Sequence, residues 1–159
     1  MANTTAMCTS FKKELLNGSH ALGTQATNSV RTVTTKDTFN GALYLVTATI
    51  NSTTEVYSAT GELAATGNYT AKGALLTNAT VPSTTGTTAF WTPSASLVWT
   101  NLTSSGAFDA VLIINNKSTS GGAELAVSVN TFGSQSITAG TLTLTMPTND
   151  STSALIRLA

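Results

Sequence analysis

A series of short apolar segments, separated by glycine, proline, asparagine and serine, extends from residue 39 to the C-terminus. Residues 141–146 alternate strictly, with Leu142, Leu144 and Met146 on one face, as a strand with one buried face does. We expect further extended segments at residues 42–50, 55–59, 74–81, 87–91, 95–102, 108–114, 125–129 and 154–158. About nine or ten short strands without a helical crossover predict an all-β fold, an antiparallel β-sandwich or barrel of the jelly-roll-like or Ig-like kind.

Two of these segments indicate which positions are buried. Residues 108–114 are continuously apolar, which is typical of a central strand covered on both faces. Residues 95–102 place Leu97 and Trp99 on one face and Val98 on the other. Residues 115–122 are polar and contain Gly-Gly, so they predict a hairpin loop.

Charged residues make up only 9% of the chain, against about 25% in an ordinary soluble domain. Threonine replaces much of the missing charge, and its β-branched side chain suits a pleated strand. The formal net charge is zero and the basic residues are scattered, which argues against nucleic-acid binding. We expect no membrane span and no secretory signal, because no apolar stretch has the required length. A surface with few charges and no net charge tends to associate with other surfaces.

The N-terminal region predicts a helix rather than a strand. Thr9 or Ser10 can cap it, Phe11, Leu15 and Leu16 form its apolar side, and an Asn-Gly pair ends it. A polar loop follows, with a short extended piece expected at residues 30–34. We therefore divide the single domain into an N-terminal arm (residues 1–38) and a β-sandwich body (residues 39–159).

The apolar side of this helix is a candidate assembly contact, because a helix of two turns is not stable alone in water. It either docks on another protein or covers one end of its own sandwich. If it docks, a chain without residues 1–17 should fold as a β domain that no longer joins its partner.

Residues that could carry catalysis are sparse. The chain has one cysteine, Cys8, and one histidine, His20, which is expected to favour the negative end of the helix. The acidic residues are dispersed, although Glu55 and Glu62 could approach each other across a turn. The chain has neither a nucleophile elbow, a phosphate-binding glycine loop nor a zinc-binding pattern. We therefore predict no enzymatic activity, no metal and no cofactor.

The two tryptophans differ in what they indicate. Trp99 and Phe108 belong to strongly apolar strands and are expected in the core. Trp91 precedes Pro93 and is either a core residue or an interface anchor, so it joins Phe11, Leu15 and Leu16 as a candidate assembly contact.

Several segments together carry a resemblance to a known family. They are residues 7–16 (MCTSFKKELL), 57–62 (YSATGE) with the later Tyr69, 108–113 (FDAVLI), 132–135 (FGSQ) and 144–150 (LTMPTND). Over nearly its whole length the chain resembles a family of small tailed-bacteriophage virion proteins. These motifs are structural, so the resemblance assigns no functional residue to any position of this chain.

The resemblance implies a structural protein of the virion, made in the host cytoplasm and similar to capsid decoration or cement proteins. It implies the major capsid protein or another virion protein as a partner, and self-association, for example as a trimer. A tail, head–tail connector or fibre component is the alternative, with glycan or receptor binding through exposed aromatic residues. A glycan-degrading enzyme would instead require two converging carboxylates.

Overall fold

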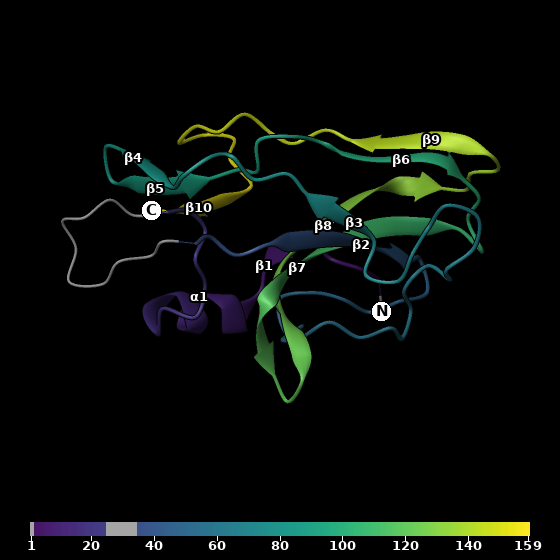
Figure 1. The fold of residues 1–159 in the computed structure, drawn as a ribbon, viewed down its shortest axis with the longest axis horizontal. Helices are drawn as coiled ribbons and strands as arrows, with labels where there is room; N and C mark the ends of the chain where they lie inside the picture. The colour runs from purple at the N-terminus through teal and green to yellow at the C-terminus, as the bar shows by residue number, and fades with distance from the viewer. Residues whose placement is uncertain (1, 25–34) are drawn as a thin grey trace.

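The computed structural model describes residues 2–24 and 35–159 and is mostly β-structure with one short helix in the described part (Figure 1). The predicted all-β, sandwich-like fold is confirmed, and every strand pairing is antiparallel. The elements are β1 (Ala6–Met7), α1 (Thr9–Leu16), β2 (Phe39–Leu45), β3 (Ala74–Leu76), β4 (Ser83–Thr85), β5 (Thr88–Trp91), β6 (Leu97–Leu102), β7 (Phe108–Ser120), β8 (Ala123–Gln135), β9 (Gly140–Leu144) and β10 (Ile156–Leu158). The extended piece expected at residues 30–34 lies outside the described residues.

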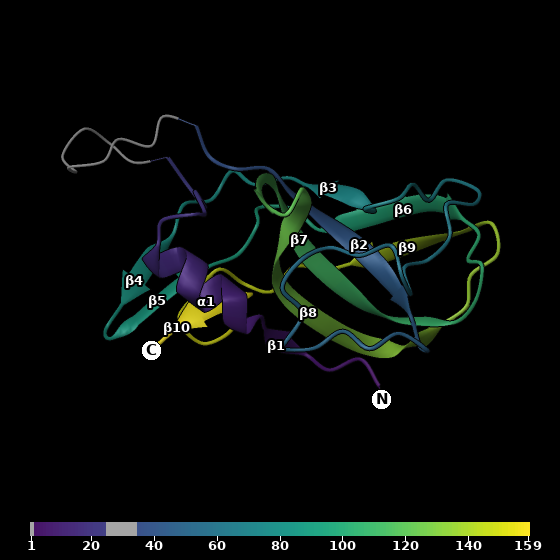
Figure 2. The same ribbon diagram turned by 90° about the horizontal axis from the view of Figure 1, so that it is seen from below.

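The strands form two layers of unequal width and a small third sheet. The first layer has five strands in the order β1-β8-β7-β2-β3, and the second contains β6 and β9. Strands β10, β5 and β4 form the small sheet at one end of the molecule (Figures 1 and 2). The continuously apolar part of β7 lies at the centre of the first layer, and its residues 110–114 are buried as predicted.

The loop expected at residues 115–122 is mostly strand. Strand β7 continues to Ser120, and β8 begins again at Ala123, directly opposite. Only Gly121 and Gly122 form the turn, and both have positive φ angles, which glycine adopts at little cost. Main-chain pairing therefore extends the hairpin through polar residues that carry no hydrophobic signal.

Other strand boundaries also differ from the expectation. The segment at residues 42–50 leaves the sheet after Leu45, where a turn bonds the amide of Ala48 to the Leu45 carbonyl. Residues 55–59 contribute only an isolated bridge between Val56 and Leu125. Strand β4 was not expected, because its sequence Ser-Thr-Thr is exposed and contains no apolar residue.

The N-terminal segment belongs to the first layer and is not a separate arm. Strand β1 pairs with β8, and the Asn3 side chain donates hydrogen bonds to the Leu45 carbonyl and to Asp109. Helix α1 lies on the side of the first layer opposite β6 and β9 and contacts β8 (Figures 1 and 2). Removing residues 1–17 would therefore remove part of the core.

Helix α1 begins and ends close to its expected limits. The residue before its first turn is Cys8, whose side chain makes no capping hydrogen bond, so Thr9 and Ser10 lie inside the helix rather than at its cap. The helix ends at Asn17, followed by Gly18 with φ +67°, as the Asn-Gly pair predicted.

Candidate assembly surface

The structure separates the four predicted assembly contacts. Phe11 is fully buried and Trp91 is 1% exposed, so neither side chain is available to a partner in this conformation. Leu15 is half-buried against the core, and Leu16 is 90% exposed. Phe11 and Trp91 therefore lie in the core and Leu16 lies on the surface, because the helix packs its own apolar side onto the sheet.

Both tryptophans serve the interior. Trp91 packs against Phe39 with ring centroids 5.3 Å apart, which decides its role in favour of the core. Trp99 is 5% exposed and packs near Tyr69, with 6.5 Å between the centroids. These rings therefore cannot form the exposed aromatic platform that glycan binding would require.

A buried polar cluster joins α1 to β7. The Glu14 carboxylate lies 2.9 Å from His20 Nε2, and the His20 side chain is fully buried. The Asn115 amide donates to His20 Nδ1 at 2.8 Å and to Asp37 Oδ2 at 2.7 Å. Since Nδ1 accepts this bond, the proton of a neutral ring lies on Nε2 and is donated to Glu14. His20 therefore fixes the helix through Glu14, not through the helix terminus as the sequence suggested.

The single cysteine is part of the core. Cys8 is fully buried, and burial, reinforced by the negative charge of Glu14, raises its pKa to about 12. The thiol is therefore protonated at neutral pH, and a protonated thiol is a poor nucleophile. Phe11, which is also fully buried, contacts the His20 ring edge-on.

A second polar cluster surrounds Glu62, which is 8% exposed. Its carboxylate accepts hydrogen bonds from the hydroxyls of Tyr57 and Tyr69, the latter at 2.7 Å. It also accepts the backbone amide of Lys72, at 2.7 Å, where the chain turns with φ +69°. Glu55, which the sequence allowed as a neighbour of Glu62, lies at an exposed position and takes no part in these hydrogen bonds. Instead, Glu62 holds together the loop between β2 and β3.

The tyrosines around this cluster stay protonated to unusually high pH. Burial raises the pKa of Tyr44 and Tyr69 well above the usual value, and the negative charge of Glu62 adds to both shifts. The Lys72 ammonium forms an ion pair with Glu124. Partial burial opposes ionisation of Glu124, but the hydrogen bond from Lys72, a main-chain hydrogen bond and the positive charge of Lys72 together outweigh it and lower the pKa of that carboxyl.

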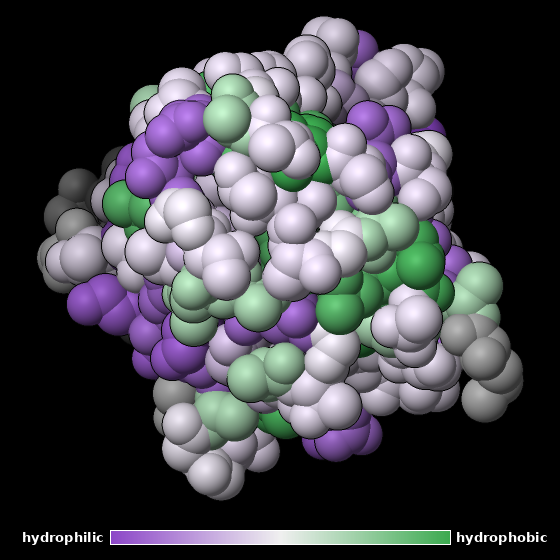
Figure 3. All heavy atoms as spheres, turned by 90° about the vertical axis from the view of Figure 1, so that its right-hand side faces the viewer, coloured by the Kyte–Doolittle hydropathy of each residue, from purple (hydrophilic) through white to green (hydrophobic). Residues whose placement is uncertain are grey.

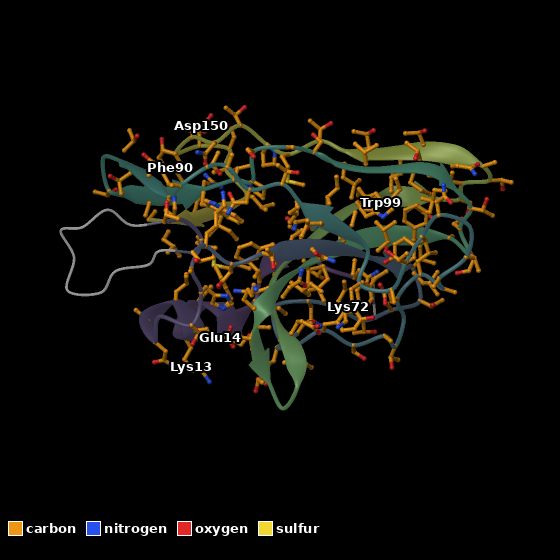
Figure 4. The ribbon with its side chains drawn as sticks, in the orientation of Figure 1. Lys13, Glu14, Lys72, Phe90, Trp99 and Asp150 are labelled. Carbon is orange, nitrogen blue, oxygen red and sulfur yellow. The ribbon has the colours of Figure 1, made fainter. Side chains whose placement is uncertain are left out.

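These clusters occupy one side of the molecule. Figure 4 shows Lys13, Glu14 and Lys72 on the side of α1, while Trp99 lies between the layers. We call this side, where α1 and the loop at residues 46–66 lie against the first layer, the covered face. Within the described residues, no group of three or more His, Cys, Asp or Glu side chains could hold a metal ion.

On the opposite side, strands β6 and β9 carry no charge. No charged residue occurs at residues 73–108 or 125–149, which include all of β6 and β9. We call the outer surface of these two strands, formed by Val98, Thr141 and Thr143, the strand face. Val98 is 49% exposed and lies opposite Thr143, so the two side chains are neighbours.

Part of this surface was foreseeable from the sequence. The alternation at residues 95–102 already pointed Val98 away from Leu97 and Trp99. Leu16, a candidate contact from the sequence, is also exposed, whereas the exposed Leu75, Val81 and Leu158 had no such signal and lie far apart along the chain. Figure 3 shows the end of the sandwich next to the loops as mostly pale, with separate hydrophilic and hydrophobic patches, as expected where threonine and serine replace charge.

Comparison with family models, curated proteins and solved structures found no match to this chain. None of the described helices has the length and apolar character needed to cross a membrane. The candidate surface is therefore defined by the molecule itself: an uncharged sheet opposite a face that is closed by polar clusters.

Proposed function

We propose that this protein is a non-enzymatic structural component of a tailed-bacteriophage virion, most simply a decoration or cement protein that binds the outside of the capsid shell. The observation that carries this proposal is the strand face. It is an uncharged sheet surface with one half-exposed valine among threonines. Such a surface can be desolvated against another protein without burying an unpaired charge.

The polar clusters support a scaffolding role. Glu14 bonds to His20, and the Asn115 amide bonds to both His20 and Asp37. Glu62 accepts hydrogen bonds from two tyrosine hydroxyls. Catalytic acids and bases need access to a substrate atom. Here the titratable groups hold loops and the helix onto the first layer, which suits a rigid body that presents its sheet to a partner.

The copy number of the protein per particle tests this proposal. Virions are purified, and the protein is quantified by mass spectrometry against the major shell protein with isotope-labelled peptides of both. A decoration protein gives on the order of hundreds of copies in a simple ratio to the shell protein, because it follows the shell symmetry. Complete absence from the particle would overturn the structural role itself.

An intermediate result would favour the alternative, a tail, head–tail connector or fibre component. Such parts follow low cyclic symmetry and occur in about six to a few tens of copies. The glycan-binding variant of this alternative is weakened by the burial of Trp91 and Trp99. The major capsid protein, or another virion protein, is the partner in the first case, and a tail or connector protein in the second.

A further inference from the structure

The second layer of the sandwich is narrower than the first. Strand β6 lies over β2, because a Cβ built on Gly41 would come within 2.3 Å of the Leu97 side chain. Strand β9 is the neighbour of β6 in the second layer and lies over β7, because Leu144 of β9 and Val111 of β7 line the same groove. Neighbouring strands are about 4.8 Å apart, so the next position in the second layer lies over β8. No strand of the described residues occupies that position.

A groove of about 360 Å³ lies at this position. Its floor consists of Val111 and Ile113 from β7 and Phe132 from β8. Its wall is formed by Leu144 at the end of β9 and by Met146 just beyond it, with Leu155 on the returning chain. None of the residues that line the groove is charged.

The chain beyond β9 is held in place at the far end of the groove. The Asp150 carboxylate accepts hydrogen bonds from the amides of Thr152 and Ser153, at 2.8 and 2.7 Å. The amide of Leu155 bonds to the hydroxyl of Thr92 at 2.9 Å. Hydrogen bonds therefore hold the chain that follows β9 in place beside the groove.

Strand β9 has a second edge with no strand partner among the described residues. Natural proteins usually protect such edges with charged side chains, proline, bulges or a covering segment. Residues 140–144 contain neither a charge nor a proline. Leu142 is buried and Thr143 is exposed, so a strand added here would continue the same alternation of buried and exposed positions.

We propose that the groove accepts one extended, uncharged peptide segment of a partner protein, which pairs with the free edge of β9 and becomes the third strand of the second layer. Main-chain hydrogen bonds to β9 would hold it, and apolar side chains at alternate positions would enter the groove over Phe132 and Val111. The absence of charge in the lining selects an uncharged segment, because a buried charge would have no counter-ion there.

A second copy of the whole domain does not fit this position. If β9 paired antiparallel with β9 of another copy, the two first layers would lie on the same side of the joined sheet. Each first layer extends beyond β9 by β8 and β1, so the two layers would overlap. A single flexible strand avoids this overlap, which is why we assign the occupant to an extended segment.

A synthetic peptide tests the proposal on the isolated protein. The probe is the capped seven-residue peptide Thr-Val-Thr-Val-Thr-Val-Thr, and the control peptide has proline at its central position, which removes the strand hydrogen bond there. Titration is followed by the amide chemical shifts of the ¹⁵N-labelled protein. We expect saturable shifts in residues 141–146 and at Phe132 below about 1 mM probe, corresponding to weak binding.

A matched pair of variants separates groove binding from general adhesion. Met146→Lys places a charge at the groove wall with little change in side-chain length, and Thr85→Lys places the same charge on the exposed strand β4. Met146→Lys should weaken binding at least tenfold, and Thr85→Lys should leave it within twofold. Thermal unfolding of both variants shows that they are folded before binding is compared.

Three results would overturn the proposal: no shifts in β9 at saturating probe, shifts located elsewhere, or equal binding of the proline peptide. Concentration-dependent self-association that Met146→Lys abolishes would assign the groove to a second copy and would also overturn it. The test uses no virion, so its outcome is independent of the copy number that tests the proposed function.

Discussion

The two faces of the first layer are covered in different ways. On the covered face, a helix and irregular loops are tied down by buried polar clusters around His20 and Glu62. On the other face, β6 and β9 cover only part of the sheet, without a single charged residue. Irregular segments leave main-chain polar groups that need partners, whereas strands satisfy one another. The difference teaches that buried charged side chains hold the helix and the loops of the covered face, whereas β6 and β9 contain no charged residue.

The largest expected effect is alkaline unfolding, which reports on the covered face. Cys8, Tyr44 and Tyr69 have raised pKa values in the folded protein, so folding favours their protonated forms. Their stabilising contribution is complete below the unfolded pKa, 9.0 for Cys8 and 10.0 for the tyrosines, and is lost as the pH rises above it. At about 1.4 kcal/mol for each pH unit and group, the three groups together lose about 5 kcal/mol by pH 11.

Urea unfolding between pH 7 and 11, with phenolate absorbance recorded in parallel, measures this loss. In the Cys8→Ala variant, the decrease in the free energy of unfolding that begins above pH 9 should be absent. The decrease that begins above pH 10 should remain. If the tyrosines of the folded protein titrate near their usual pKa, the clusters on the covered face do not exclude water as described.

Substitution of Phe11 tests whether the helix belongs to the fold. Phe11 is fully buried, so Phe11→Ala should lower the free energy of unfolding by about 3–5 kcal/mol. Leu16→Ala, at the exposed end of the same helix, should change it by less than about 0.5 kcal/mol. Equal small effects in urea unfolding would restore the interpretation of the helix as a detachable arm.

Substitution of Glu62 tests the second cluster on the covered face. Glu62→Gln keeps the shape but removes the charge that three donors share, and the amide group adds donors where acceptors are needed. We expect a loss of about 2 kcal/mol in the free energy of unfolding. The control is Glu55→Gln at an exposed position, which should have almost no effect. A loss for Glu55→Gln as large as that for Glu62→Gln would contradict the assignment of this cluster to Glu62.

The regular face was the easier part to predict from the sequence. Alternation placed Leu97 and Trp99 inside and Val98 outside, and continuous hydrophobicity placed β7 at the centre. Strand β4 and the outer half of the β7–β8 hairpin were not predicted, because strands made of threonine and serine have no hydrophobic pattern. Their pairing follows from neighbouring strands and turns, which local sequence does not encode.

The polar clusters could not be predicted for a different reason. His20 is hydrogen-bonded to Asn115 although 95 positions separate them, and no sequence pattern predicts a contact over that separation. Phe11 and Trp91 carried the right signal, large apolar side chains, but that signal does not distinguish a core from an interface. The groove beside β9 could not be predicted either, because it depends on how many strands each layer contains, and the sequence does not show how strands are divided between layers.

The smallest effect on stability, and the sharpest test of the difference between the faces, concerns Val98. Val98→Lys adds a charge to the strand face at a half-exposed position and should change the free energy of unfolding by less than about 0.5 kcal/mol. Incorporation into virions should nevertheless fall strongly, because the charge would be buried against the shell. Leu16→Lys, the same kind of change at a more exposed position on α1, should incorporate normally. If both variants incorporate at full copy number, the strand face is not the docking surface. If Val98→Lys fails to incorporate yet still binds the alternating peptide, the strand face and the groove are separate contacts: the first holds the particle and the second holds a partner's strand.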